Sequence, residues 1–359
     1  MPLSLTLISE AFPMEKRGMA IGLWGGIAGL AVAAGPVVGG AVIEGLDWRW
    51  IFWLNVPIGL TLVPLASARL SESYGPRPNL DIVGLALAAT GFLGLTWGLV
   101  RANIAGWDSA EVIATLIGGA ALVGAFFLWE RRSRSPMLSL SLFGQRGFAT
   151  ANGVSFFMYA GLFGALFLMS QFFQTALGNS PLEAGLLILP WTATPMVFAP
   201  IAGALADRFG NRPFMLLGLG MQAFGLGWVA SIASPGMGYW ELGVALTVAG
   251  IGTSMCFPTV ANAVMSSVPL QEAGVASGTN SSVRELGGVF GVAVLAAVFI
   301  HEGDYASPRA FTDGFVPALW VGAGFSALGM VAALLAPGRS DAVAHEAAKA
   351  EPATVAVEP

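Results

Sequence analysis

The amino-acid sequence predicts an all-α membrane protein with about ten complete transmembrane helices. Hydrophobic residues make up 55% of the chain and charged residues only 10%, whereas a soluble domain carries roughly 25% charged residues. Long runs without Asp, Glu, Lys or Arg recur along the chain, and a membrane-spanning helix needs about 20 apolar residues. Because lipid offers no partners to unpaired backbone groups, each run is expected to be a helix. The runs are too long and too continuous for barrel strands.

Nine of these runs are long enough, or nearly long enough, to span a bilayer: residues 18–43, 51–68, 82–100, 112–129, 147–182, 184–206, 213–240, 242–271 and 314–338. A tenth, residues 286–300, reaches the length of a span only if it also takes in Arg284 and Glu285. A large soluble protein can bury one or two such segments, but ten leave no polar surface to face water.

The basic residues predict how the helices are oriented. If the loops alternate sides and residues 10–17 are cytoplasmic, 13 Lys and Arg residues lie inside and 3 outside. Cytoplasmic loops carry just such an excess of Lys and Arg. We therefore expect a multi-pass protein of the plasma membrane, or of the inner membrane where a cell has two, with a cytoplasmic carboxyl terminus.

The composition also predicts several absences. The single cysteine, Cys256, lies in an apolar run, so that no disulfide framework is expected. With two histidines and one cysteine in the chain, no metal site is expected. The pI near 5.1 argues against a nucleic-acid partner. No G-x-x-x-x-G-K-[ST] motif is found, and neither ATP-driven transport nor an enzyme activity is expected of this chain.

The spans divide the chain into four segments. Residues 1–68 hold two spans behind the apolar stretch "MPLSLTLIS", which is too short to cross a bilayer and resembles the cytoplasmic half of a helix. Residues 69–146 hold a pair of spans with flanking cytoplasmic loops, and residues 147–338 hold six spans with short loops. Residues 339–359 are rich in Ala, Glu and Pro without an apolar period, which predicts a disordered cytoplasmic tail.

Small residues form one face of the first predicted span. They recur at steps of three and four from Gly18 to Gly40, which is the spacing of one helical face. In lipid, helices associate where small residues let their backbones approach, and neighbouring helices make a proline tolerable. This face is either a generic packing surface or, as we favour, a seal between two moving helices. The candidate residues are Gly22, Gly25, Gly29, Gly35, Pro36, Gly39 and Gly40.

The loop "GALADRFGNRP" at residues 203–213 is a candidate gate on the cytoplasmic side. Gly203 would let helices approach, and Gly210 would adopt a positive φ. Asp207 is expected near the start of the following helix, where a carboxylate interacts well with the helix dipole. Arg208 and Arg212 would bridge to neighbouring helix ends. The alternative is a basic cytoplasmic turn that happens to hold an aspartate.

Arg284 and Glu285 are the charges placed deepest in a predicted span. Ionisable groups at membrane depth are functional candidates, here as a proton or charge relay. The alternative is a pair at the cytoplasmic interface, with the Arg284 side chain extended toward water. Both interpretations stay open.

A second set of side chains is a candidate lining for a substrate cavity. Aromatic faces attract cations, so that a hydrophobic or cationic ligand would suit them. Most of these residues are expected simply to face lipid or core. The candidates are Phe156, Tyr159, Phe163, Gln171, Gln174, Trp191, Met255 and Asn262, with Phe257 beside them.

Together these residues resemble the major facilitator superfamily, and specifically its fourteen-helix drug:proton antiporters. "GPVVGG" at residues 35–40 resembles the antiporter motif of that family's fifth helix, and "WRWIFWLNVPIGL" at residues 48–60 resembles its next segment. The loop at residues 203–213 resembles the superfamily's signature loop in its carboxyl-half copy, although Asn211 replaces a basic residue that is usual there. The spans at residues 82–100 and 112–129 match the family's extra central pair.

The resemblance implies a fold of six helices, a central pair and six more. This chain would then lack about three and a half amino-terminal helices. It would also lack the amino-half signature loop and the membrane-embedded acidic residue that the family commonly uses for proton coupling. Residues 1–68 would be the remainder of the amino-terminal half, and residues 147–338 a complete carboxyl-terminal half. "MPLS" resembles the interior of the fourth helix, so that Met1 is expected to be an internal methionine.

The resemblance further implies proton-coupled efflux of a small hydrophobic or cationic substrate by alternating access. No cofactor is expected, since the proton gradient supplies the energy, and the protein is expected to be monomeric. The glycine face would limit proton leak, Asp207 would help to latch the cytoplasmic side, and Glu285 would titrate. Three alternatives stay open: an inactive fragment, an exporter of a native metabolite, and a membrane sensor or scaffold that transports nothing.

Overall fold

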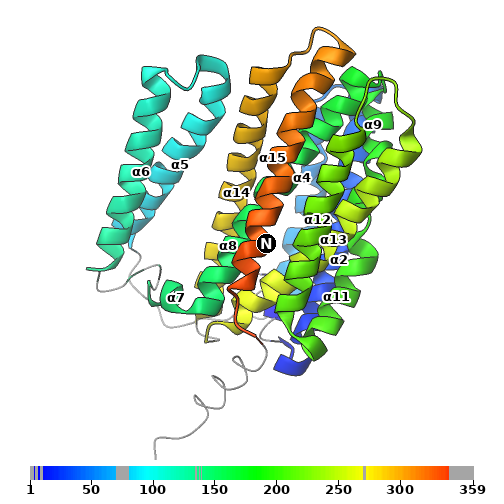
Figure 1. The fold of residues 1–359 in the computed structure, drawn as a ribbon. Coiled ribbons are helices and arrows are strands. Elements are labelled where there is room, and N and C mark those ends of the chain that lie inside the picture. Colours follow the sequence, from blue (N-terminus) through cyan, green and yellow to red (C-terminus); the bar gives the residue numbers. More distant parts are fainter. Residues whose placement is uncertain are drawn as a thin grey trace, which may run out of the picture.

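The computed structural model describes residues 4, 7–8, 11–69, 81–133, 136, 138, 140–269 and 272–338, and the regular structure in these residues is entirely helical (Figure 1). Among these residues, ten helical segments are long and apolar enough to cross a membrane. This number confirms the count predicted from the charge-free runs. The all-α membrane fold is thus established by length and composition.

The helices follow each other along the chain in an order that the sequence largely predicts. They are α2 (Met14–Gly45), α3 (Trp50–Trp53), α4 (Asn55–Arg69), α5 (Ile82–Ala105), α6 (Ala110–Glu130), α7 (Ser141–Gly144), α8 (Arg146–Gln171), the π-helical turn η1 (Phe172–Ala176), α9 (Pro181–Leu187), α10 (Leu189–Thr192), α11 (Pro195–Phe209), α12 (Asn211–Ile232), α13 (Tyr239–Ser266), α14 (Ala273–Glu302) and α15 (Pro308–Leu334).

Two predicted runs differ from the observed helices. The charge-free run at residues 147–182 ends as a helix at Ala176, and a new helix begins after Ser180, which forms a capping box with Glu183. The run at residues 184–206 is not one helix but the segments α9, α10 and α11, with Pro190 and Pro195 near the breaks. Proline removes a backbone donor and its ring clashes with the preceding turn. The tenth span is α14, which includes Arg284 and Glu285 as the sequence required.

The helices from α8 to α15 pack around a common core. Its largest cluster of buried residues contains stacked aromatic rings, with Phe172 on Phe315 at 4.4 Å between ring centroids and Phe311 packed against Phe299 at 4.7 Å. α5 and α6 form a hairpin that stands to one side of this bundle and meets it through α14 (Figure 1). α4 buries no residue against the rest of the described chain.

The α5–α6 hairpin is fastened where it begins and ends. Asp81 caps α5 by accepting a hydrogen bond from the Gly84 N–H at 2.8 Å, and it accepts another from the Trp129 Nε1–H at 2.9 Å. The Gly84 hydrogen bond is the main reason that the pKa of Asp81 lies below its usual value. At the other end of the hairpin, Arg101 pairs with Glu111 at 3.2 Å.

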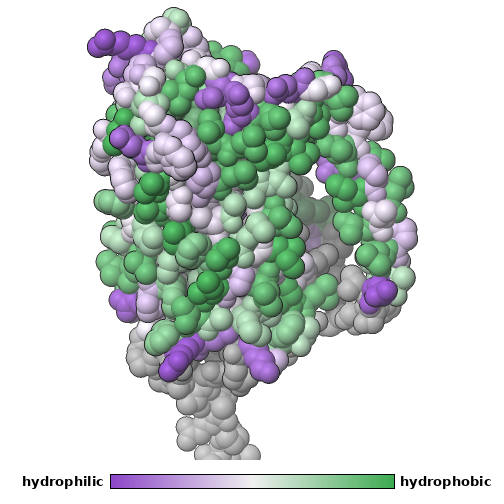
Figure 2. All heavy atoms as spheres, turned by 90° about the vertical axis from the view of Figure 1, so that its right-hand side faces the viewer, coloured by the Kyte–Doolittle hydropathy of each residue, from purple (hydrophilic) through white to green (hydrophobic). Residues whose placement is uncertain are grey.

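The surface agrees with a protein that sits in lipid. Figure 2 shows hydrophobic residues over most of the middle of one face and hydrophilic residues gathered toward its two ends. α2, α8, α12 and α14 all begin at one end of the bundle, where Lys16, Arg146, Arg208 and Arg212 lie. We call this the basic end. Arg49, Arg101 and Arg309 lie at helix ends on the opposite side.

Candidate functional site

The small-residue face of α2 lies directly against α11 and α9. A Cβ added at Gly22 would come within 2.9 Å of the Ala199 carbonyl oxygen, and one at Gly40 within 2.5 Å of the Pro181 carbonyl oxygen. A Cβ at Gly29 would meet the side chain of Pro195. At Gly22 and Gly40 backbone therefore touches backbone, which only glycine permits.

The seven candidate residues of α2 do not all lie on one face of the helix. Gly25 faces Phe257, and the Pro36 carbonyl lies where Gly185 of α9 has no side chain. A Cβ at Gly35 or Gly39, however, would meet nothing within 4 Å. At about 100° per residue these two glycines point well away from the contact stripe. The contact with α11 and α9 therefore includes five of the seven candidate residues, and Gly35 and Gly39 lie outside it.

Asp207 connects the end of α11 to the beginning of α2. Its carboxylate accepts hydrogen bonds from the Gly18 and Met19 backbone N–H groups, both at 2.9 Å. The sequence placed Asp207 at the start of the following helix, but it lies in the last turn of α11, and the dipole it faces is that of α2. Gly203 makes this possible, because a Cβ there would meet the Gly18 carbonyl oxygen.

The rest of the loop joins neighbouring helices at the basic end. Gly210 has φ +87°, the positive value that the tight turn requires. The Arg212 guanidinium donates to the Leu334 carbonyl oxygen at the end of α15, at 2.8 Å. Arg208 lies over the ring of Phe209 at 5.5 Å. Asn211, which replaces the usual basic residue, accepts a hydrogen bond from the Asn262 amide of α13 at 3.0 Å.

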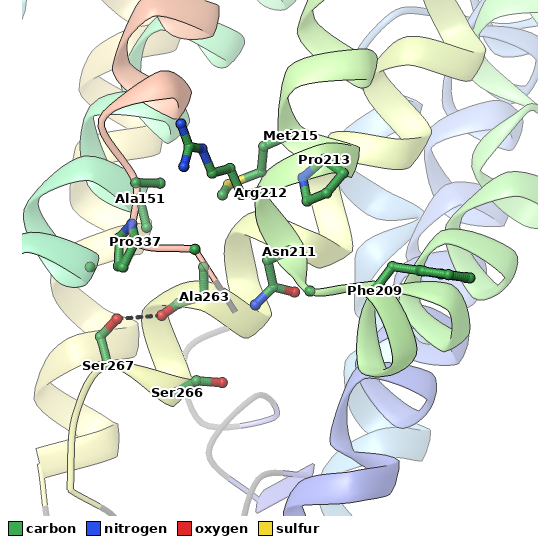
Figure 3. A pocket seen from close by; sticks show the side chains of 14 residues that line it. Ala151, Phe209, Asn211, Arg212, Pro213, Met215, Ala263, Ser266, Ser267 and Pro337 are labelled. Carbon is green, nitrogen blue, oxygen red and sulfur yellow. Dashed lines mark hydrogen bonds between the residues drawn. The ribbon is translucent and has the colours of Figure 1, made fainter. Parts of the chain in front are cut away.

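A pocket of about 250 Å³ lies beside this loop and was not predicted from the sequence (Figure 3). Its wall is mainly apolar, and Figure 3 shows Ala151 and Pro337 across from Pro213 and Met215. Ser267 lines it as well, but its hydroxyl donates to the Ala263 carbonyl oxygen at 2.6 Å. The polar groups of the pocket are thus largely occupied by the protein itself.

The second candidate site is a cluster of aromatic rings around Arg284. The Arg284 guanidinium carbon lies 4.6 Å from the ring centroid of Tyr159 and 5.5 Å from that of Phe257. Tyr159 stacks on Phe163 at 5.6 Å, and Phe257 stacks on Trp24 at 5.6 Å. We call these five residues the Arg284 cluster. They come from α2, α8, α13 and α14.

Arg284 and Glu285 point in different directions. The Arg284 Nε is buried and has no hydrogen-bond partner, and within the described ranges no ion pair reaches this guanidinium. Glu285 is exposed. Successive helical residues point about 100° apart, so that these two charges do not form one relay in this conformation.

Three of the other predicted cavity residues lie apart from Tyr159 and Phe163. Gln171 lies at the far end of α8, where it accepts a hydrogen bond from the Tyr305 hydroxyl at 2.6 Å. Trp191 is buried in the main aromatic core, and Asn262 lies at the basic end. The helices are long enough to separate residues that share a helix face. The remaining three are Phe156, which packs on Phe157 and Phe290, the exposed Gln174 and the half-buried Met255.

Sequence reasoning missed Trp24. It lies between Gly22 and Gly25 of α2, and its ring lies almost parallel to that of Phe257, with 10° between the planes. A tryptophan inside a stripe of small residues is the signal that could have found it. Because Trp24 belongs to α2, the same helix contributes both to the small-residue contact and to the Arg284 cluster.

Comparison with known proteins agrees with this architecture. The sequence model of the Major Facilitator Superfamily matches residues 1–129 and 151–359. The tetracenomycin C resistance and export protein of Streptomyces glaucescens is 29% identical over 319 residues, which are 88% of this chain and 59% of that protein. The multidrug resistance protein Stp of Mycobacterium tuberculosis is 34% identical over 298 residues, which are 82% of this chain and 55% of that protein. The chain thus spans little more than half the length of these relatives.

A solved structure shows the same fold. The proton:xylose symporter XylE, bound to 6-bromo-6-deoxy-D-glucose, superposes with a TM-score of 0.56 at 18% sequence identity. The match covers 96% of this chain and 70% of that protein.

Proposed function

Because this chain belongs to the major facilitator superfamily, whose members are transporters and not enzymes, we propose that it serves the export of small molecules, including drugs or antibiotics. The names of its relatives, resistance and export proteins, support this direction of transport. The observation that carries the proposal is the contact of α2 with α11 and α9, in which glycines on both sides let backbone meet backbone at Gly22 and Gly40.

The proposed mechanism is alternating access, in which two helical units rock around a central site. A contact made of backbone and small residues has few interlocking side chains, so that two helices can slide along it while water and protons stay excluded. At the basic end, Asp207 fastens α11 to the start of α2 through two hydrogen bonds of 2.9 Å. Opening that end requires these bonds to break, and Asp207 therefore acts as a latch.

The finer features of the proposal follow the resemblance to fourteen-helix drug:proton antiporters. The proton gradient drives export, the basic end faces the cytoplasm, and the α5–α6 hairpin is the central pair. Glu285 remains the proposed proton-coupling residue, supported by its position twelve residues beyond Ala273 in α14.

The experiment that tests export is an accumulation assay in a bacterium that lacks its major efflux pumps. The full chain is expressed, and the uptake of a panel of fluorescent anionic, neutral and cationic aromatic compounds is measured with and without a proton uncoupler. We expect lower accumulation of at least one compound, restored by the uncoupler. Gly29→Leu should abolish the effect because its side chain collides with Pro195, whereas the exposed Asp313→Asn should not. Unchanged accumulation of every compound would overturn the proposal.

A further inference from the structure

The Arg284 cluster has an unusual arrangement of charge for a hydrophobic site. Arg284 lies eleven residues after Ala273, about 16 Å along α14, and thus within the hydrocarbon depth of a bilayer. A cation at that depth is costly unless something neutralises it or binds to it. Within the described residues no carboxylate pairs with it.

The aromatic rings reduce this cost only in part. The faces of Tyr159 and Phe257 lie 4.6 and 5.5 Å from the guanidinium carbon, within the range of cation–π attraction. Such contacts stabilise the charge but satisfy none of its N–H donors. The buried Nε therefore keeps a donor without a hydrogen-bond partner, beside the two rings that the guanidinium carbon approaches. The N–H groups of a guanidinium form a planar fork. A planar anion can accept hydrogen bonds from this fork while a ring attached to the anion stacks beside it.

The same rings disfavour a cationic ligand at this site. A cationic ligand would use the faces of Tyr159 and Phe257, but the protein's own cation already occupies them. It would moreover be repelled by Arg284. The partly exposed Phe163, at 44% of its full exposure and stacked on Tyr159, offers an open ring at the edge of the cluster.

We propose that the Arg284 cluster binds an aromatic anion, with Arg284 accepting the acidic group and Phe163 and Trp24 holding the ring. The substrate class that follows is aromatic carboxylates, sulfonates and phenolates, which differs from the hydrophobic or cationic substrate expected from the sequence. As a substrate site the proposal rests on the export function proposed above, but its test measures binding alone.

The test compares two probes of the same shape and opposite charge. The purified full chain in detergent micelles is dialysed at pH 7 against 2-naphthoate or 2-naphthylmethylammonium, with empty micelles as the blank. We expect the wild type to bind the anion at least about tenfold more tightly than the cation. Arg284→Gln should weaken anion binding about tenfold or more. The matched control Arg309→Gln removes an exposed cation at the opposite end and should change neither affinity.

A gain of affinity for the cationic probe would distinguish the loss of the Arg284 site from misfolding of the variant. Arg284→Gln vacates the faces of Tyr159 and Phe257, so that the cationic probe should bind about threefold more tightly than to the wild type. A variant that fails to fold would lose both affinities. Arg284→Lys keeps the charge without the planar fork and should retain a weaker anion preference.

Two results would overturn the proposal: equal binding of 2-naphthoate by the wild type and Arg284→Gln, or a wild type that prefers the cation. Either result leaves the export function untouched if the accumulation assay is positive. Conversely, anion binding without export would overturn the transport function and leave this site standing.

Discussion

At the scale of single residues, Asp207 shows how one carboxylate can join segments almost two hundred positions apart. Its two oxygens accept from the Gly18 and Met19 N–H groups, close to the positive end of the α2 dipole. Gly203, four residues earlier and thus one turn away, lets α2 come near enough for these bonds. The role of Asp207 therefore depends on a glycine of its own helix.

This arrangement predicts the effect of Asp207→Asn. The amide keeps one acceptor oxygen but loses the charge, so that one hydrogen bond and the charge–dipole attraction are weakened. We expect the contact between α2 and α11 to lose about 1 kcal/mol, measured as a lower midpoint of thermal unfolding in detergent. The matched control is Asp313→Asn, whose exposed carboxylate lies on α15. An equal midpoint for Asp207→Asn and the wild type would contradict the proposed latch.

At the scale of helices, α2 is a span with two different sides. One side presents Gly22, Gly29 and Gly40 to α11 and α9, and the other presents Gly35 and Gly39, where an added Cβ would meet nothing within 4 Å. Glycine therefore has opposite effects at different positions of this helix. Where backbones touch, glycine is required; where nothing is near, it only weakens the helix.

This difference predicts opposite effects of one substitution at two positions. Gly22→Ala places a Cβ 2.9 Å from the Ala199 carbonyl oxygen, so that α2 and α11 must separate. We expect a lower unfolding midpoint and, in the accumulation assay, weaker export. Gly35→Ala meets nothing and replaces glycine with a better helix former, which should leave stability unchanged or raise it by about 0.5–1 kcal/mol. Equal losses at both positions would show that α2 does not pack as described.

The same helix explains what could be predicted from the sequence and what could not. Steps of three and four residues predicted one face, and Gly22, Gly29 and Gly40 lie on it. The motif "GPVVGG", by contrast, included Gly35 and Gly39 because they are part of its sequence, although the helical turn directs them away from the contact. Local periodicity thus carried more structural information than adjacency.

At the scale of the whole molecule, the sequence predicted ten spans because a bilayer imposes one length and one composition on each. It could not predict the partners of a side chain, since these depend on which helices meet and at what height. The partner of Asp207 is α2 and not the adjacent α12. Phe257 and Trp24 meet although more than two hundred residues separate them. Such long-range contacts leave no periodic trace in the chain.

The last prediction concerns the orientation of the molecule in the membrane. The excess of Lys and Arg at the basic end predicts that this end faces the cytoplasm. Cys256, the single cysteine, is fully buried and should give no background with a membrane-impermeant maleimide. Cysteines can therefore be introduced one at a time at exposed positions: Ala306→Cys between α14 and α15, and Gly144→Cys before α8.

In intact cells the reagent should label Ala306→Cys and should not label Gly144→Cys, which should react only after the membrane is permeabilised. The wild type serves as the control for Cys256 under both conditions. The reverse pattern would place the basic end outside, and the latch formed by Asp207 would then close the outer side of the protein. Labelling of both positions in intact cells would mean that α8 to α14 do not separate them by a membrane, and the assignment of this bundle as a set of spans would be wrong.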